Sequence, residues 1–331
     1  MKILMPLFIL IALTSFAQNG NTFQINSLPT EGVLLDKGWK FQMGDNPDFA
    51  KTDFDDSAWE NIDPTKDIFD LPQIPKTGQI CWLRLRLSVD SAINTQLVMM
   101  IEQSGASEIY LNGKLIHSLG ILSKNVAEIK AYSPLREPIE FPIKTGTLQI
   151  LSVKYAFQPN VSYGTHWGTE NRLLKIKICN TEDAVEQLNQ ILKPNDDVKS
   201  NVFKIGFNSL LSILFFALYL FYKTQKVNLY FSIYALLEVC VRLIVLYVQK
   251  SHYVAEWFLP NNLIIVLAVI EYLILNFAVY RLFEEKLSLF FYFLIFLGIV
   301  SIPCGAYFYG WGWSIFAILF SNLFIVDILI I

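Results

Sequence analysis

Ionisable residues lie inside several long apolar segments, where a charge is costly; Asp327 is one, and three others stand closer together. Glu238 precedes Arg242 by four residues, which places both on one helical face in the favourable order for an ion pair. Glu271 lies in the next apolar segment, so Arg242 has Glu238 and Glu271 as alternative partners. Charges within a membrane often have a function. We therefore keep three hypotheses: packing between helices, a proton or ion path, and a conformational switch.

A second set of residues has the chemistry to bind a sugar or another small ligand. Aromatic faces stack on sugar rings, arginine and histidine donate hydrogen bonds, and binding residues are often found on loops. One such loop is predicted at 163–172, and two arginines alternate along a predicted strand. An alternative is that Trp167 covers the edge of the domain while the rest of the loop is solvated. The candidate ligand-binding residues are Tyr163, His166, Trp167 and Arg172, with Arg84 and Arg86 as alternatives.

The acidic residues at 53–56 are interpreted as stabilising the local fold rather than binding a metal ion. Asp55, Asp56 and Ser57 suit a turn or a helix cap, because their side-chain oxygens accept backbone N–H bonds. Calcium binding by Asp53, Asp55 and Asp56 is the alternative, although an EF-hand spacing is missing. The sequence contains no ATP-binding glycine motif and no phospho-acceptor histidine segment. We expect no catalytic residue, metal or cofactor in this chain.

The four cysteines are scattered along the sequence and form no metal-binding pattern. Cys240 and Cys304 fall in apolar segments and are expected to be small core residues. Cys81 and Cys179 would share an exported domain, so a disulfide between them is an alternative to two free thiols.

The elements that must position these residues fall into two regions of different composition. The chain has 331 residues, of which 53% are hydrophobic, and it carries a net charge of −3. Most of the apolar surplus lies beyond residue 200. No Lys/Arg stripe is present, which argues against nucleic acid as a partner.

Residues 30–180 alternate between apolar and polar positions over short runs, as strands do. The predicted strands cover 82–89, 96–101, 108–111, 114–116, 148–153 and 173–178. Asn112-Gly113 between two apolar runs predicts a tight hairpin, because both residues tolerate a positive φ. Trp39, Phe41 and Trp59 are expected in the core. Many short strands with little helical periodicity predict a β-sandwich or jelly roll.

Four short motifs occur in an order and at a spacing that resemble a known domain. They cover 38–41 (GWKF), 53–59 (DFDDSAW), 82–84 (WLR) and 108–114 (EIYLNGK). The set resembles the sugar-binding jelly-roll domain beside the catalytic barrel of β-galactosidase-type glycosidases. The resemblance implies a galactose-binding-like fold. It does not imply hydrolysis, because the domain that would carry the catalytic carboxylates is absent from this sequence.

The N-terminus has the pattern of a cleaved export signal. Lys2 precedes an apolar run, and Ser15 and Ala17 supply small residues at the expected cleavage positions. We predict a signal peptide at 1–17, an extracytoplasmic domain with its connector at 18–195, and a transmembrane region at 200–331. An uncleaved anchor is the alternative.

Five apolar segments approach the length of about 20 residues that a membrane span needs. They are predicted at 202–222, 228–248, 263–282, 287–307 and from 311 onward, with loops at 223–226 and 249–262. Lysine and arginine then fall mainly on the cytoplasmic side if the signal exports the first domain. The predicted location is the bacterial cytoplasmic membrane, with the N-terminal domain in the periplasm.

An exported sandwich joined to several spans, with 221–231 (FYKTQKVNLYF) between the first two, resembles bacterial seven-transmembrane receptors with diverse intracellular signalling modules. The resemblance implies seven spans and a cytoplasmic output such as a histidine kinase. This sequence has about five spans and no output domain, so we expect the input half of a signal-transduction receptor, truncated within the spans.

The expected partners of such a receptor are a small-molecule or glycan ligand, the lipid bilayer and a second copy of the chain. Two alternatives remain for the function. One is a membrane-tethered carbohydrate-binding or carbohydrate-processing module, and the other is a transporter.

Overall fold

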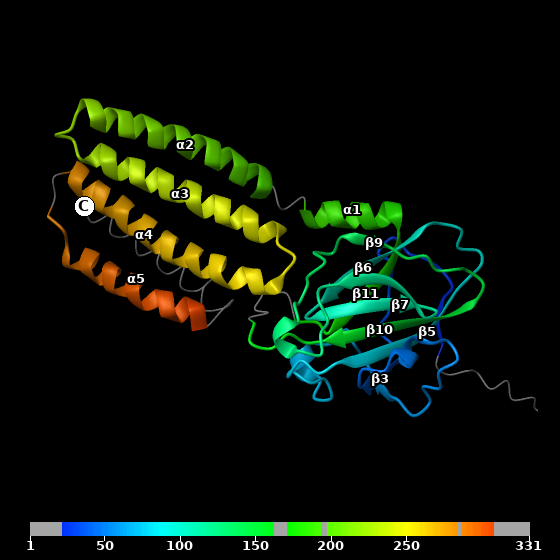
Figure 1. The fold of residues 1–331 in the computed structure, drawn as a ribbon. Helices are drawn as coiled ribbons and strands as arrows, with labels where there is room; N and C mark the ends of the chain where they lie inside the picture. The colour runs from blue at the N-terminus through cyan, green and yellow to red at the C-terminus, as the bar shows by residue number, and fades with distance from the viewer. Residues whose placement is uncertain (1–21, 162–170, 193–196, 284–285, 308–331) are drawn as a thin grey trace, which may run out of the picture.

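A computed structural model describes residues 22–161, 171–192, 197–283 and 286–307 of the chain. It contains a β-sandwich followed by a layer of long helices (Figure 1). The predicted signal peptide and most of the loop at 163–172 lie outside the described residues. The segment from 311 onward, predicted as the fifth span, also lies outside them.

The first sheet of the sandwich has seven strands, and its longest members are central. Six strands follow one path, and β1 (Thr22–Ile25) pairs in parallel with the second half of β5. The other pairs in the sheet are antiparallel. Along the path the strands are β4 (Glu60–Ile62), β3 (Trp39–Met43), β5 (Cys81–Val89), β10 (Leu148–Ala156), β7 (Ala106–Leu111) and β8 (Lys114–Leu119).

The second sheet has four antiparallel strands. Pro138 lies in β9, an edge strand, where its missing N–H removes no hydrogen bond from the middle of the ladder. The order is β2 (Val33–Leu34), β11 (Leu174–Asn180), β6 (Leu97–Gln103) and β9 (Pro138–Glu140). The predicted sandwich is therefore confirmed.

The core lies between the two sheets and follows the predicted alternation. Leu83, Leu85 and Leu87 of β5 are buried in it. Trp39 and Phe41 are also core residues, and the Trp39 indole N–H donates to the carbonyl of Leu35 at 2.8 Å. These outcomes confirm Trp39 and Phe41 as core aromatics and the period-two alternation predicted along 82–89.

The opposite side of β5 is covered as well, which alternation alone does not predict. The 3₁₀ helix η1 (Pro47–Ala50) and the segment up to Trp59 fold over Trp82. Phe49 contacts Trp59 edge-on, with ring centroids 4.9 Å apart. Trp59 is therefore a core aromatic, as predicted, but it belongs to this second apolar cluster.

The predicted hairpin at Asn112-Gly113 joins β7 to β8. Both residues have positive φ, 51° and 80°, as a type I′ turn requires. The Asn112 side chain also accepts the backbone N–H of Ile150 at 2.9 Å. The turn is thereby tied to the neighbouring strand β10.

Cys81 and Cys179 are both free, so the disulfide alternative is wrong. Cys81 lies in β5 of the first sheet and Cys179 in β11 of the second. Burial raises the pKa of both thiols, which keeps them protonated and unreactive. Cys240 is only partly buried.

The connector after the sandwich is largely helical. The helix α1 (Thr181–Leu192) begins directly after β11, whereas the sequence predicted a polar connector. Its first turn is capped reciprocally: Asn180 accepts the Asp183 backbone N–H at 2.7 Å, and the Asn180 side-chain amide donates to the Asp183 carboxylate at 2.6 Å. Ala184 packs against β6, so α1 belongs to the sandwich.

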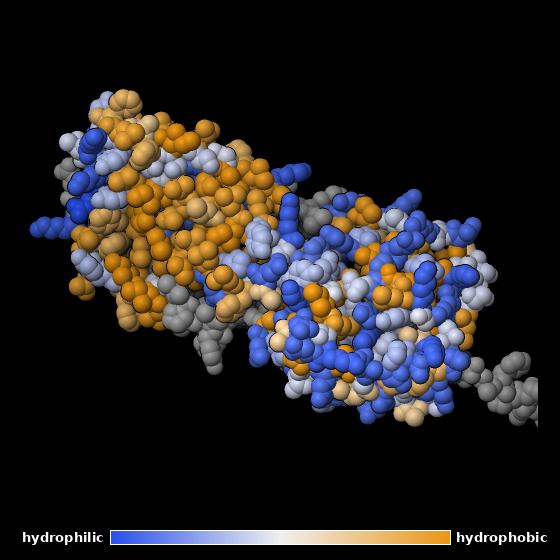
Figure 2. Space-filling view, in the orientation of Figure 1, coloured by the Kyte–Doolittle hydropathy of each residue, from blue (hydrophilic) through white to orange (hydrophobic). Residues whose placement is uncertain are grey.

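Four long helices follow. Figure 2 shows that their surface is largely apolar, whereas the surface of the sandwich mixes polar and apolar residues. Among the described residues, three helical stretches are long and apolar enough to cross a membrane: Val198–Phe221, Val227–Lys250 and Val254–Leu282. These correspond to the first three predicted spans. The helices are α2 (Asp197–Phe221), α3 (Val227–Lys250), α4 (Phe258–Leu282) and α5 (Leu289–Tyr307).

The helices pack in chain order, with α3 between α2 and α4 (Figure 1). Ser212 and Ser232 join α2 to α3, each hydroxyl donating to the backbone carbonyl of the other at 3.0 and 2.9 Å. Small polar residues let helices approach closely in a membrane. The turn between α2 and α3 lies at the end of the layer farthest from the sandwich.

Candidate functional site

The segment between α3 and α4 is shorter and more ordered than predicted. A loop was expected at 249–262, but α3 runs to Lys250 and α4 starts at Phe258. Pro260 is tolerated because it falls in the first turn of α4, where no intrahelical N–H bond is lost. Between the helices lie Ser251–Tyr253 and the 3₁₀ helix η4 (Val254–Trp257).

This segment forms backbone hydrogen bonds with the sandwich. The N–H of Ser133 donates to the carbonyl of His252 at 2.8 Å, and the N–H of Val254 donates to the carbonyl of Ala131 at 3.2 Å. Tyr132 and Tyr253 form an antiparallel β-bridge between these bonds. The loop thus adds a short strand-like pair to the sandwich, over a separation of about 120 residues in the chain.

Aromatic rings strengthen the same contact. The rings of Tyr132 and His252 stack at 4.9 Å with an interplanar angle of 4°. Tyr253 contacts Tyr132 edge-on at 5.6 Å. The His252 ring nitrogen Nδ1 lies 2.9 Å from the Ser133 carbonyl oxygen, to which it donates as the Nδ1–H tautomer.

An apolar anchor completes the contact. Val254 is 3% exposed and belongs to the sandwich core, and Trp257 packs against that core. The Trp257 indole N–H donates to the Ser251 carbonyl at 2.9 Å, which fixes the ring over the junction. We call residues 131–133 and 251–257 the junction. It joins the outer surface of the sandwich to the ends of α3 and α4.

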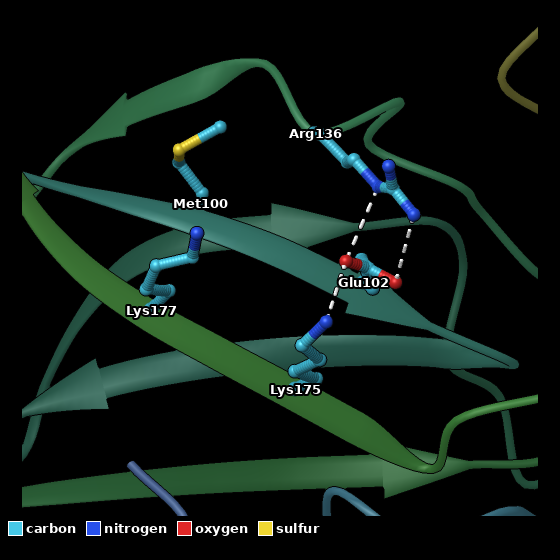
Figure 3. A pocket seen from close by; sticks show the side chains of 5 residues that line it. All are labelled: Met100, Glu102, Arg136, Lys175 and Lys177. Carbon is cyan, nitrogen blue, oxygen red and sulfur yellow. Dashed lines mark hydrogen bonds and ion pairs between the residues drawn. The ribbon is translucent and has the colours of Figure 1, made fainter. Parts of the chain in front are cut away.

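A polar pocket lies on the second sheet. It has a volume of about 150 Å³ and is lined by Met100 and Glu102 of β6, Lys175 and Lys177 of β11, and Arg136. Figure 3 shows Glu102 between Arg136 and Lys175, with Lys177 on the other side of the pocket. Arg136 Nε lies 3.2 Å and Lys175 Nζ 3.0 Å from Glu102 Oε1.

The electrostatics of the pocket are predominantly positive. Burial raises the pKa of the Glu102 carboxyl, but the charges of Arg136 and Lys175 outweigh it and hold that pKa below its usual range. Lys177 Nζ donates to the Gln187 side chain of α1 at 2.7 Å. Nothing in the sequence pattern indicated this pocket, because its residues come from two strands and a turn that only the fold brings together.

Arg84 and Arg86, the alternative ligand-binding residues, converge on Asp56. Arg84 is fully buried and its Nε lies 3.0 Å from Asp56 Oδ2, while Arg86 Nη2 lies 2.5 Å from Asp56 Oδ1. Arg84 also donates to the carbonyls of Phe49 and Lys51. Asp56 therefore faces two cations, the reverse of what the calcium alternative requires.

The predicted turn at 55–57 is present, since Asp55 accepts the backbone N–H of Ser57 at 3.0 Å. Tyr163, His166 and Trp167 lie outside the described residues, so their predicted role stays a prediction. Arg172 is described: it donates to the carbonyl of Thr65 at 2.6 Å and forms a β-bridge with Asp67.

Glu238 and Arg242 of α3 form the ion pair that their spacing predicts. Arg242 Nη2 lies 2.6 Å from Glu238 Oε1. Glu271 of α4 is buried and lies beside Glu238. The structure thus brings together the three predicted intramembrane residues in one cluster between α3 and α4.

No family model and no curated protein matches the chain. Solved structures of glycosidases do match parts of it. A glycosyl hydrolase family 2 member from Bacteroides cellulosilyticus is 19% identical, with a TM-score of 0.30 over 44% of this chain. Bacteroides uniformis β-glucuronidase 2 is 20% identical with a TM-score of 0.32. Amycolatopsis orientalis exo-chitosanase CsxA is 12% identical with a TM-score of 0.31.

The chain matches only a small part of these enzymes. The matches cover 20%, 17% and 20% of the three solved chains. At TM-scores near 0.3, nothing about the activity of this chain follows from them.

Proposed function

We propose that this chain is the input half of a membrane receptor, in which the sandwich binds a ligand outside the cytoplasmic membrane and the junction passes the change to the helices. The docking of residues 251–257 onto the sandwich carries the proposal. A domain that was only tethered to a membrane would need a connector at 193–196 and nothing else. Here a second, independent contact links the sandwich to the ends of α3 and α4.

The chemistry of the junction suits a two-state contact. It combines two backbone hydrogen bonds, the His252–Ser133 hydrogen bond, two rings packed on Tyr132, and the buried Val254 with Trp257 beside it. This contact is small compared with the core of the sandwich, so it can rearrange while the sandwich stays folded. A ligand shifts such an equilibrium only through a difference in affinity for the two arrangements. Helices α3 and α4 run from the junction to the opposite side of the layer, so a shift at one end displaces the other.

The test uses the full chain in lipid nanodiscs and a panel of saccharides: glucose, galactose, glucuronate and galacturonate. Hydrogen exchange is measured at the α2–α3 turn, residues 222–226, with and without each sugar. We expect a sugar that binds the sandwich to change exchange at this turn. His252→Ala should weaken that response while binding is retained, because it removes the stack and one hydrogen bond. A response of equal size in His252→Ala would contradict the proposal.

A second candidate function is transport of a proton or ion, favoured by the cluster of Glu238, Arg242 and Glu271. Two carboxylates facing one arginine inside a membrane resemble the polar groups along ion paths. The decisive variant carries Glu238→Gln, Arg242→Gln and Glu271→Gln together. If the cluster carries a proton or cation, flux into vesicles should be lost in this triple variant. If wild-type vesicles show no flux above lipid alone, the transporter proposal is wrong.

A further inference from the structure

The pocket on the second sheet is unusual in its charge. Three cationic side chains and one carboxylate line it, so its lining carries a net charge of +2. Glu102 already accepts from Arg136 and Lys175. Among the described residues, Lys177 donates a hydrogen bond to the neutral side-chain amide of Gln187. The positive charge in this pocket therefore exceeds what Glu102 neutralises.

The backbone that presents Arg136 is held in a rare conformation. Leu135 and Arg136 have φ of 53° and 61°, the left-handed region that residues other than glycine seldom adopt. A turn closes around them, with the N–H of Glu137 donating to the carbonyl of Pro134 at 3.0 Å. Positive φ at both central residues is the pattern of a type I′ turn, and this turn fixes the position from which the Arg136 side chain starts.

The same turn follows directly from the junction. Ser133 bonds to His252, and Arg136 enters the pocket three residues later. A ligand group that binds in the pocket and contacts Arg136 therefore also affects the neighbouring residues 131–133. These residues hold the loop between α3 and α4. The pocket is thereby placed next to the contact on which the proposed function depends.

We propose that this pocket binds a small oxyanion, a phosphate, sulfate or carboxylate group, between Lys177, Lys175 and Arg136. A volume of about 150 Å³ accommodates a group of that size. Arginine and lysine are the side chains that hold such anions. Because Arg136 presents Nε and Nη2 to Glu102, its other N–H donors are the ones that would contact the anion. Glu102 opposes the anion, and it positions Arg136 and Lys175 in its absence.

Two sources supply this chemistry: a soluble anion and the phosphate of a lipid headgroup. The pocket adjoins the junction, at the ends of α3 and α4 where the bilayer surface would lie. The assay therefore has two arms. One adds sodium sulfate to the full chain in phosphatidylcholine nanodiscs, against sodium chloride at equal ionic strength. The other replaces phosphatidylcholine by phosphatidylglycerol without sulfate.

The readout is the thermal unfolding temperature of the sandwich, followed by tryptophan fluorescence. A ligand at ten times its dissociation constant should raise this temperature by about 2–5 °C in the wild type. Lys177→Gln should abolish most of the rise. Lys114→Gln, which removes an exposed lysine on the hairpin, should keep it. Glu102→Gln should make the rise begin at a lower sulfate concentration, because the competing carboxylate is gone.

The outcomes separate the sources and the two proposals. A rise that depends on Lys177 with sulfate identifies a soluble anion, and one that depends on Lys177 only with phosphatidylglycerol identifies a headgroup. No rise in either arm, or an equal rise in Lys177→Gln, overturns the site. Binding of an oxyanion in this pocket does not depend on the receptor proposal. Only the effect of the bound anion on the helices rests on it. An oxyanion that binds without changing exchange at residues 222–226 would leave the site standing and show that this site does not take part in the receptor role.

Discussion

Asp56 neutralises Arg84 and Arg86, which alternate along β5 and were candidate ligand-binding residues. Alternation along β5 correctly assigned Arg84 to the side opposite the leucine core. It gave no sign that residues 47–59 fold over that side, because these residues lack a periodic pattern. The contacts of Arg84 with Asp56 and with two backbone carbonyls depend on this cover. Its partners could not be predicted from the strand alone.

Replacing Asp56 should therefore destabilise the sandwich strongly. Asp56→Asn leaves the fully buried Arg84 without its counter-charge, which typically costs about 3–5 kcal/mol. We expect a loss of that size in the free energy of unfolding, measured by urea unfolding of the full chain with tryptophan fluorescence. The control is Asp55→Asn at the exposed turn, where the loss should be much smaller because the side chain is solvated. Equal losses in the two variants would contradict the assigned network.

Glu102 should make stability depend on pH in a defined direction. Its pKa in the folded protein is lowered below the ordinary value of 4.5. A lowered folded pKa means that the carboxylate stabilises the fold above pH 4.5, and that this contribution is lost as the pH falls through the folded pKa. The stability difference between wild type and Glu102→Gln should thus shrink on acidification below pH 4.5. A difference that is the same at pH 7 and pH 3 would show that the charge of Glu102 is not responsible.

At the scale of elements, the long strands and spans were predictable, and the short connecting elements were not. The hairpin at Asn112-Gly113 and the strand at Cys81–Val89 have local signals of turn chemistry and alternation. Helix α1 also had a local signal, because Asn180 and Asp183 form a capping pair before Ala184. The polar composition of this segment obscured that signal. The start of α4 was placed too late because Pro260 was interpreted as a loop residue.

Gly120 controls the connection from β8 to the junction. It has a φ of 92°, and a Cβ there would collide with the carbonyl oxygen of Lys130, next to Ala131 and Tyr132 of the junction. Gly120→Ala should lower the free energy of unfolding by about 1–3 kcal/mol and loosen the junction. Thermal unfolding and hydrogen exchange of the Val254 N–H would measure both effects.

The matched control for this substitution is Gly206→Ala in α2. Nothing lies within 4 Å of a Cβ at Gly206, and alanine is the better helix former by about 1 kcal/mol. We expect Gly206→Ala to be neutral or stabilising. If Gly120→Ala also left the free energy of unfolding unchanged, residues 120 and 130 could not lie as close together as described.

At the scale of the whole molecule, the sandwich and the helices are held together at two places. One is the chain connection after α1. The other is the junction, which joins residues about 120 positions apart and so leaves no signal in any local pattern. The sequence predicted a sandwich and a set of spans, but the contact between them could be found only in the structure.

The most direct test measures how firmly the junction fixes the sandwich against the helices. Spin labels at positions 114 on β8 and 224 in the α2–α3 turn report the distance between the two regions in lipid nanodiscs. The comparison is between Val254→Asp, which places a charge in the sandwich core, and Val185→Asp, which makes the same change at an exposed valine of α1. We predict a narrow distance distribution in the wild type and in Val185→Asp, and a broad one in Val254→Asp. A distribution that stays equally narrow in Val254→Asp would contradict the role of the junction.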